Sequence, residues 1–195
     1  MGKYNIKSIR RKVLKSRSFN KQASKKINQS LAKARSIMMS DFDNHPISKE
    51  LSQGPDGRNS SSTLGGYGNL FSFIGFDSSE DPVGEVRKLL MRYPRLSKGR
   101  MGNSKIVFTI SIPSLIDFAA ISKMPWEGGR SWVTGVEVGI SGFSSYMYGM
   151  FGSSKKSRSG KAIQADRQIR ADSFKPMPYM SNIIKRLVTN ITAGI

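Results

Sequence analysis

Hydrophobic positions recur at helical spacing through the first forty residues. Ile6, Ile9 and Val13 lie three and four residues apart. A second run continues at intervals of four and three: Phe19, Ala23, Ile27, Leu31, Ala34 and Met38. Such spacing places apolar side chains on one face of an α-helix. Ser18 or Asn20 could cap a second segment, so the pattern predicts either one long helix or two.

Four further helices are predicted downstream, each from a start signal or from apolar spacing. Pro46 suits the first position of a short helix over residues 44–51, and Gly54 suits its stop. His45 precedes that proline and is interpreted as a polar turn residue. The other three helices are expected after Asp81-Pro82 as far as Arg92, after Pro113-Ser114 over residues 115–121, and over residues 180–191.

Other segments have the composition of β-strands. Residues 105–112 alternate apolar and polar side chains, which is typical of a half-buried strand. Residues 69–76 and 131–138 are dense in aromatic and branched side chains and are also expected to be strands, with a turn at 124–129 and a possible return strand at 162–164. The element order does not repeat as βαβ. We therefore expect an α+β body, a mostly antiparallel sheet packed by helices, with Gly/Ser-rich loops at 54–68 and 152–160.

Charge divides the 195-residue chain into two parts. It holds 32 Lys and Arg against 13 Asp and Glu, and twelve of the basic residues fall within residues 1–40, where no acid occurs. We therefore expect a basic helical arm over residues 1–40 and an α+β body over 41–195, closed by the amphipathic C-terminal helix. Like charges four apart, such as Lys21 and Lys25, disfavour the isolated helix, so the arm needs a surface that offers apolar contact and negative charge.

That requirement leaves two interpretations of the arm open. It could pack on its own body as a solvated helix, or it could reach a neighbouring subunit or nucleic acid. The basic residues expected to contact a partner or nucleic acid are Arg10, Arg11, Lys12, Lys15, Arg17, Lys25 and Lys26, together with Lys155, Lys156 and Arg158 of the loop at 152–160. DNA, RNA and an acidic protein surface all satisfy the charge. A membrane surface is not expected, because the arm has no Trp and few large apolar anchors.

The composition excludes several kinds of chemistry. The chain has no cysteine and one histidine, so cysteine nucleophiles, Cys-zinc sites and multi-His metal sites are excluded. No phosphate-binding loop, dinucleotide turn or nucleophile elbow is found. We therefore expect no enzyme, no cofactor and no metal. No apolar run approaches 18 residues, so no transmembrane helix is expected.

The order of several short segments resembles the neck and tail-completion proteins of tailed bacteriophages, a group that includes tail terminators and head–tail connectors. The segments are HPISKEL at 45–51, LGGYGNLFSFIGF at 64–76, GRSW at 129–132, VEVGISG at 136–142, SRSGKAIQ at 157–164 and PYM at 178–180. The likeness covers roughly residues 5–190. The Gly-Thr that usually follows the Glu strand in that family is Gly139-Ile140 here.

The resemblance implies a non-catalytic virion protein, made in the host cytoplasm. It implies a homo-oligomeric ring, usually a hexamer, that joins the capsid connector to the tail or terminates the tail tube. Partners would be adjacent connector, tail-tube or sheath proteins, with DNA passing through the lumen. Glu137, Gly139 and Gly142 are candidates for the ring interface, with an ordinary turn as the alternative for the two glycines. A basic nucleic-acid-binding protein, ribosomal or associated with DNA packaging, is the alternative for the chain as a whole.

Overall fold

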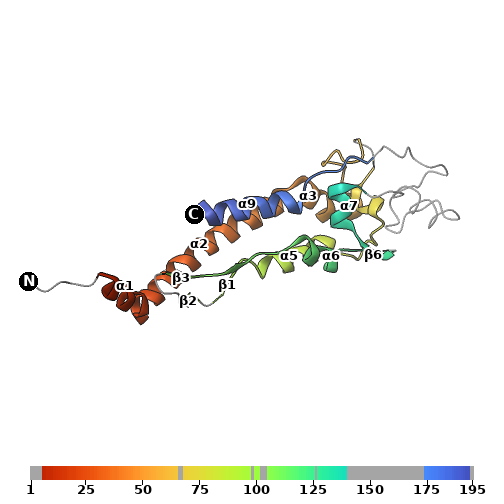
Figure 1. Cartoon of the computed structure of the whole chain (residues 1–195). Helices are drawn as coiled ribbons and strands as arrows, with labels where there is room; N and C mark the ends of the chain where they lie inside the picture. The colour runs from red at the N-terminus through yellow and green to blue at the C-terminus, as the bar shows by residue number, and fades with distance from the viewer. Residues whose placement is uncertain are drawn as a thin grey trace, which may run out of the picture.

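The molecule is elongated and mainly helical, and α1 lies at one end of it (Figure 1). The computed structural model describes residues 6–65, 68–97, 99–101, 105–125, 127–139 and 174–193. Short antiparallel strands accompany the helices, and a long basic helical segment begins the chain. The predicted α+β class is therefore confirmed, with helices as its larger part.

The N-terminal segment forms two helices, α1 (Ile6–Lys15) and α2 (Arg17–Asn44). The break falls at Ser16, whose ψ of 128° is extended, and not at the caps expected at Ser18 or Asn20. Asn20 has a different part in the junction. Its Nδ2 donates to the carbonyls of Leu14 and Ser16, both at 2.9 Å. The Leu14 carbonyl lies in the last turn of α1, where helical partners are missing, and the Ser16 carbonyl also accepts from the Asn20 N–H at 3.1 Å as α2 begins.

The second half of α2 packs against α9 (Met180–Ala193) as the main long-range contact of the fold. The buried side chains of α2 are Leu31, Ala34, Met38 and Phe42, and those of α9 are Met180, Ile183 and Leu187. The surface of this pair is joined by an ion pair of 2.9 Å between Arg186 and Asp41. Figure 1 shows the two helices side by side. The predicted amphipathic C-terminal helix is thus confirmed.

Three predicted helices of the body begin at the expected caps. They are α3 (Pro46–Ser52), α5 (Pro82–Met91) and α6 (Leu115–Ile121), and a 3₁₀ turn, η1 (Gly54–Asp56), follows α3. His45 caps α3, since its Nδ1 accepts from the Ile47 N–H at 3.3 Å. Asp81 accepts from the Gly84 N–H at 2.8 Å, and Ser114 forms a capping box with Asp117. Short polar side chains at these positions fix where each helix starts.

Two segments predicted as strands are helices instead. They are α4 (Leu70–Ile74) and α7 (Trp132–Val138). Asn69 caps α4 by accepting from the Ser72 N–H at 2.8 Å, and Gly75 ends it at φ +91°. Ser131 caps α7 in the same way through the Thr134 N–H, at 3.2 Å. A short apolar run fits either structure, and here the caps on both sides decide for helix.

The described strands form three two-stranded antiparallel ladders. They pair β1 (Arg95–Leu96) with β4 (Ile110–Ser111), β2 (Arg100–Met101) with β3 (Ile106–Val107), and β5 (Lys123–Met124) with β6 (Glu127–Ser131). The first two ladders make one long hairpin, which we call the ribbon (residues 95–112). The single strand predicted at 105–112 is therefore split into β3 and β4. The turn expected at 124–129 is shorter than predicted, because Met124 belongs to β5 and residues 127–129 belong to β6.

The Gly/Ser-rich loop after α3 is held from inside by a buried carboxylate. Glu50 has no exposed surface. Its Oε1 accepts from Asn59 Nδ2 and from the Leu70 N–H, both at 2.8 Å, and its Oε2 accepts from the Ser61 N–H at 2.9 Å. Multiple hydrogen bonds of this kind offset the cost of burying a charge. The expected surface excursion is thus tied to the core at its middle.

Candidate interaction surface

Helix α1 exposes its apolar face. Ile6 is 78% exposed, Ile9 49% and Val13 47%, and no residue of α1 is buried. The main packing partner of α1 is α2, which follows it directly. Large apolar side chains arranged along one helix face and left in water are typical of a contact surface.

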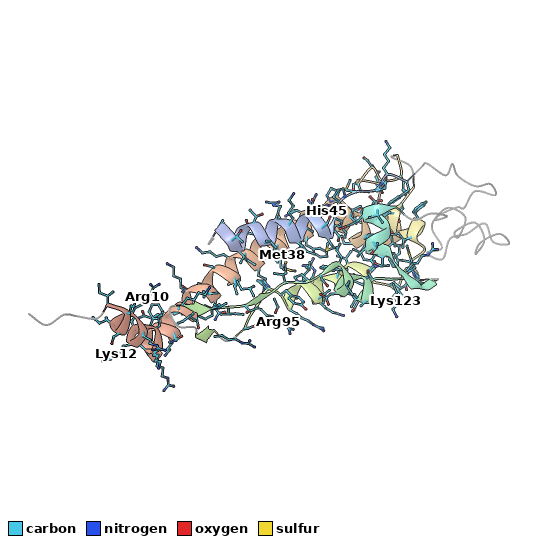
Figure 2. All side chains as sticks on the ribbon, viewed as in Figure 1. Arg10, Lys12, Met38, His45, Arg95 and Lys123 are labelled. Carbon is cyan, nitrogen blue, oxygen red and sulfur yellow. The ribbon has the colours of Figure 1, made fainter. Side chains whose placement is uncertain are left out.

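The same end of the molecule is densely cationic. Residues 6–30 carry nine Lys and Arg and no Asp or Glu. All seven predicted contact residues of this region are exposed: Arg10, Arg11, Lys12, Lys15, Arg17, Lys25 and Lys26. Figure 2 shows Arg10 and Lys12 on α1, far from Lys123 in the body. Together, α1 and the first half of α2 form a surface with a narrow apolar stripe and a cationic rim, which we call the arm surface (residues 6–30).

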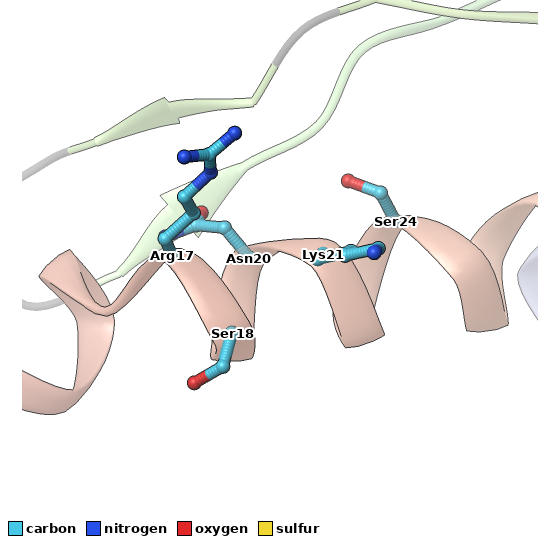
Figure 3. A pocket seen from close by; sticks show the side chains of 5 residues that line it. All are labelled: Arg17, Ser18, Asn20, Lys21 and Ser24. Carbon is cyan, nitrogen blue, oxygen red and sulfur yellow. The ribbon is translucent and has the colours of Figure 1, made fainter.

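The α1–α2 junction also carries an open hollow. It is lined by side chains of α2 alone: Arg17, Ser18, Asn20, Lys21 and Ser24 (Figure 3). Two cations, two hydroxyls and an amide could hold an anionic group of a partner at this position. The amide of Asn20 is already engaged in bracing the junction. All five lining residues fall within residues 6–30, so the hollow is a part of the arm surface and not a separate site.

The ribbon adds cations that the sequence did not assign to this surface. Arg95, Arg100 and Lys105 are exposed, and Figures 1 and 3 both show the ribbon next to the first turns of α2. Arg35 anchors the start of the ribbon, since its Nε donates to the Tyr93 carbonyl at 2.8 Å and its guanidinium donates to that of Pro94 at 2.9 Å. Only the fold brings these residues near α2, because they lie more than fifty positions from it in the chain.

Close packing of this ribbon requires a glycine directly before β2. A Cβ on Gly99 would lie 2.8 Å from the side chains of both Ile106 and Phe108. Gly99 therefore allows the two strands of the ribbon to approach where a larger residue would push them apart.

Glu137, a predicted ring-interface residue, is engaged within the chain. It lies on α7, and its Oε1 accepts from the Ser181 N–H at 2.7 Å and from the Tyr179 N–H at 3.3 Å. A carboxylate at this position satisfies orphan donors at the start of α9 and complements the helix dipole. Gly139 ends α7 at φ +79°, so this site is a helix terminus and not the end of the strand predicted at 131–138. A role for either residue at a ring interface stays a prediction.

The remaining predicted residues lie outside the described part of the chain. They are Gly142, Lys155, Lys156 and Arg158, together with the loop at 152–160 and the possible strand at 162–164.

The single histidine belongs to a structural cluster. The Nδ1 atom of His45 is used by the helix cap, and its ring packs 4.7 Å from the centroid of Tyr179. Burial lowers the pKa of His45 below its ordinary value of 6.5, against the opposite effects of a hydrogen bond to the Pro178 backbone and the charge of Glu137. Tyr179 is fully buried, and its hydroxyl lies 2.6 Å from that of Ser48. Desolvation raises the pKa of Tyr179 far above its ordinary value of 10.0, so the phenol stays neutral.

Other kinds of site were sought in the same described residues. Within them, no group of three or more His, Asp or Glu side chains could hold a metal ion. None of the helices described is long and apolar enough to cross a bilayer. No model of a known protein family matches the sequence, and no similar protein was found among curated proteins or among solved structures.

Proposed function

We propose that this chain is a structural subunit of a tailed-phage virion, which assembles into a ring in the neck and joins the capsid connector to the tail or terminates the tail tube. The observation that carries the proposal is the arm surface, where the exposed stripe of Ile6, Ile9 and Val13 is surrounded by cations with no acid in the same segment. The ordered sequence segments support the phage setting.

The energetics of α1 favour a partner. A ten-residue helix is marginal in water by itself, and the like charges of Lys7, Arg11 and Lys15 at i,i+4 weaken it further. No side chain of α1 is buried, so its own body stabilises it little. A surface that covers the apolar stripe and carries negative charge would remove both deficits. This is the expected property of a subunit whose final stability comes from its neighbours.

The polar groups of the body serve its structure. Ser48 bonds to Tyr179, His45 caps α3, Glu50 holds a loop and Glu137 caps α9. None of these contacts pairs a nucleophile with a base. We therefore propose a protein that binds and does not catalyse.

A nucleic-acid-binding protein is the second candidate, and the ribbon favours it. The strands β1, β2 and β3, which carry or adjoin exposed Arg95, Arg100 and Lys105, lie in the same half of the molecule as the cationic arm, which would broaden a phosphate-binding surface. Such binding would depend steeply on salt, because each phosphate contact releases counterions. The exposed apolar stripe has no part in that chemistry, so we place it second.

Two measurements test the proposal. Mass spectrometry of purified virions should detect the chain, and native mass spectrometry or light scattering of the purified protein should find a closed oligomer. Absence from particles, together with a monomer at high concentration, would contradict the virion role. A duplex DNA affinity that falls steeply with salt in wild type, and is lost in Arg10→Gln/Lys12→Gln, would favour the second candidate.

A further inference from the structure

Within the part of the chain that the structure describes, α6 presents a second exposed apolar face. Ile116 is 81% exposed and Leu115 49%, and Ala120 one turn later is also exposed. Phe118 on the opposite side of the helix is fully buried and fixes α6 against the body. The exposed face is thus presented by a helix that packing and a capping box hold in place.

The electrostatics beside α6 are opposite to those of the arm. Helix α6 packs against α5. The loop before α5 and its first turn carry Asp77, Glu80, Asp81 and Glu85, and residues 77–85 contain no Lys or Arg. Residues 77–85 therefore form a short acidic segment near α6, while Lys88 on α5 pairs with Glu85 at 2.6 Å and Lys123 lies on β5. The acid-free arm and this acidic segment are complementary in charge, and α1 and α6 both expose apolar side chains.

One chain cannot join these two surfaces to each other. α2 has 28 residues and spans about 42 Å as a straight helix. Its second half is fixed in the core by Leu31, Met38 and Phe42, and its N-terminal junction with α1 is braced by Asn20. Figure 1 accordingly shows α1 and α6 in opposite halves of the molecule. α6 of the same chain therefore cannot cover α1, whereas α6 of a second molecule can.

We propose that α1 of one copy docks on the α6 face of a second copy, with Ile9 and Val13 against Leu115 and Ile116 and the cationic rim facing the carboxylates near α5. This inference rests on the proposed ring and names its contact. Because the two surfaces are different patches, the interface is heterologous, and repetition of it closes a ring when the rotation between subunits allows closure. The occupant of the arm surface is thus the chain itself.

Single-patch variants test the contact on the full chain. Ile9→Gln/Val13→Gln removes the two side chains of the α1 stripe that are placed in the contact and keeps the charge of α1, and Ile116→Gln removes the most exposed large side chain of α6. Val138→Gln is the matched control, since Val138 on α7 is also exposed, at 70%. Sedimentation velocity should show wild type and Val138→Gln as the same oligomer. The two patch variants should need a concentration about tenfold higher or more to assemble.

Mixing the two patch variants provides the sharper readout. Each retains one intact surface, so an equimolar mixture should form a dimer that cannot grow, from the intact arm of Ile116→Gln and the intact α6 face of Ile9→Gln/Val13→Gln. A contact between two arms, or between two α6 faces, would not produce that mixed dimer. Circular dichroism and urea midpoints equal to wild type would establish that both variants are folded.

Several outcomes would overturn the inference. An oligomer that both patch variants retain would place the contact elsewhere and leave the proposed ring intact. A wild-type chain that stays monomeric at every concentration tested would reject self-docking, while detection in virions would still support the structural role. Loss of binding to duplex DNA or to phosphatidylglycerol vesicles in the arm variant, with assembly unchanged, would assign the arm to that other partner.

Discussion

The two halves of α2 differ in what covers an otherwise similar helix. Both continue the same apolar spacing, yet Leu31, Ala34 and Met38 are buried against α9 and the rest of the core, whereas the segment before Leu31 has no buried residue. Periodicity therefore predicts a helix and its apolar face, but it does not tell what covers that face. In the second half the described part of the chain covers that face, and in the first half it leaves every residue of α2 before Leu31 at least partly exposed.

Charge separates the same two regions. In the body, acids meet bases across elements, as in the 2.6 Å contact between Arg87 and Asp43 and the 2.9 Å contact between Arg186 and Asp41. The arm surface has no acid with which to do this. Acids and bases thus pair within the body, and under the proposed function a partner would supply the acids that the arm lacks. Substitutions in the body should therefore lower stability more than substitutions in the arm.

Tyr179→Ala should have the largest effect. The side chain is fully buried, 4.7 Å from the ring of His45 and 6.1 Å from that of Phe42, so its removal leaves a cavity where three segments meet. We expect the free energy of unfolding to fall by about 3–5 kcal/mol in urea titrations. Ile6→Ala, in the exposed stripe of the arm, should change it by about 0.5 kcal/mol or less.

Tyr179→Phe is the control for the hydroxyl. It keeps the ring and leaves the buried Ser48 hydroxyl without its 2.6 Å partner, which should cost about 1 kcal/mol. Equal losses for Tyr179→Ala and Ile6→Ala would show that the body and the arm are stabilised alike, and would remove the basis of the comparison.

Glu50→Gln should have the next largest effect. In wild type the backbone N–H groups of Ser61 and Leu70 donate to the Glu50 carboxylate. The amide of the variant would turn its own N–H groups toward one of these donors. A loss of about 1–3 kcal/mol is expected, because a buried donor is left unpaired. Limited proteolysis should then cut within residues 54–65 faster than in wild type. Unchanged cleavage would mean that the loop does not depend on Glu50.

The sequence predicted helix starts correctly where a polar residue caps the first turn. Asp81-Pro82, Ser114 and His45-Pro46 each mark a start that the structure confirms. It failed at residues 70–74 and 132–138, because a five- to seven-residue apolar run carries no decisive period and the caps Asn69 and Ser131 were not recognised.

The candidate surface was predicted in part. The arm cations form a contiguous charge run, which is visible in the sequence. The cations of the ribbon, the carboxylate of Glu50 and the cap of α9 by Glu137 depend on contacts between segments twenty to forty or more residues apart. The spacing of residues along the chain does not indicate which distant segments meet, so only the fold reveals these contacts.

His45→Asn should flatten the pH dependence of stability. Burial lowers the pKa of His45 in the folded chain, so near its ordinary value of 6.5 the unfolded chain binds more protons. The stability from this group is therefore present above that value and is lost as the pH falls toward the folded pKa. Asn keeps a capping acceptor and removes the titration. Urea midpoints between pH 8 and 5 should fall less in the variant than in wild type, and parallel curves would contradict this.

Arg11→Glu should have the smallest effect on stability and act in opposite directions on folding and docking. A carboxylate at position 11 replaces two like-charge contacts at i,i+4, with Lys7 and Lys15, by two attractive ones. Each is worth about 0.2–0.5 kcal/mol to the helix. Amide exchange in α1 should slow while the urea midpoint of the body is unchanged, and assembly should weaken because the cationic rim is interrupted. Arg11→Gln should fall between wild type and Arg11→Glu in both readouts. If the helix became more stable and assembly improved with it, the charge of the arm would serve neither its fold nor its partner, and the difference between the two halves of α2 would reduce to apolar contact alone.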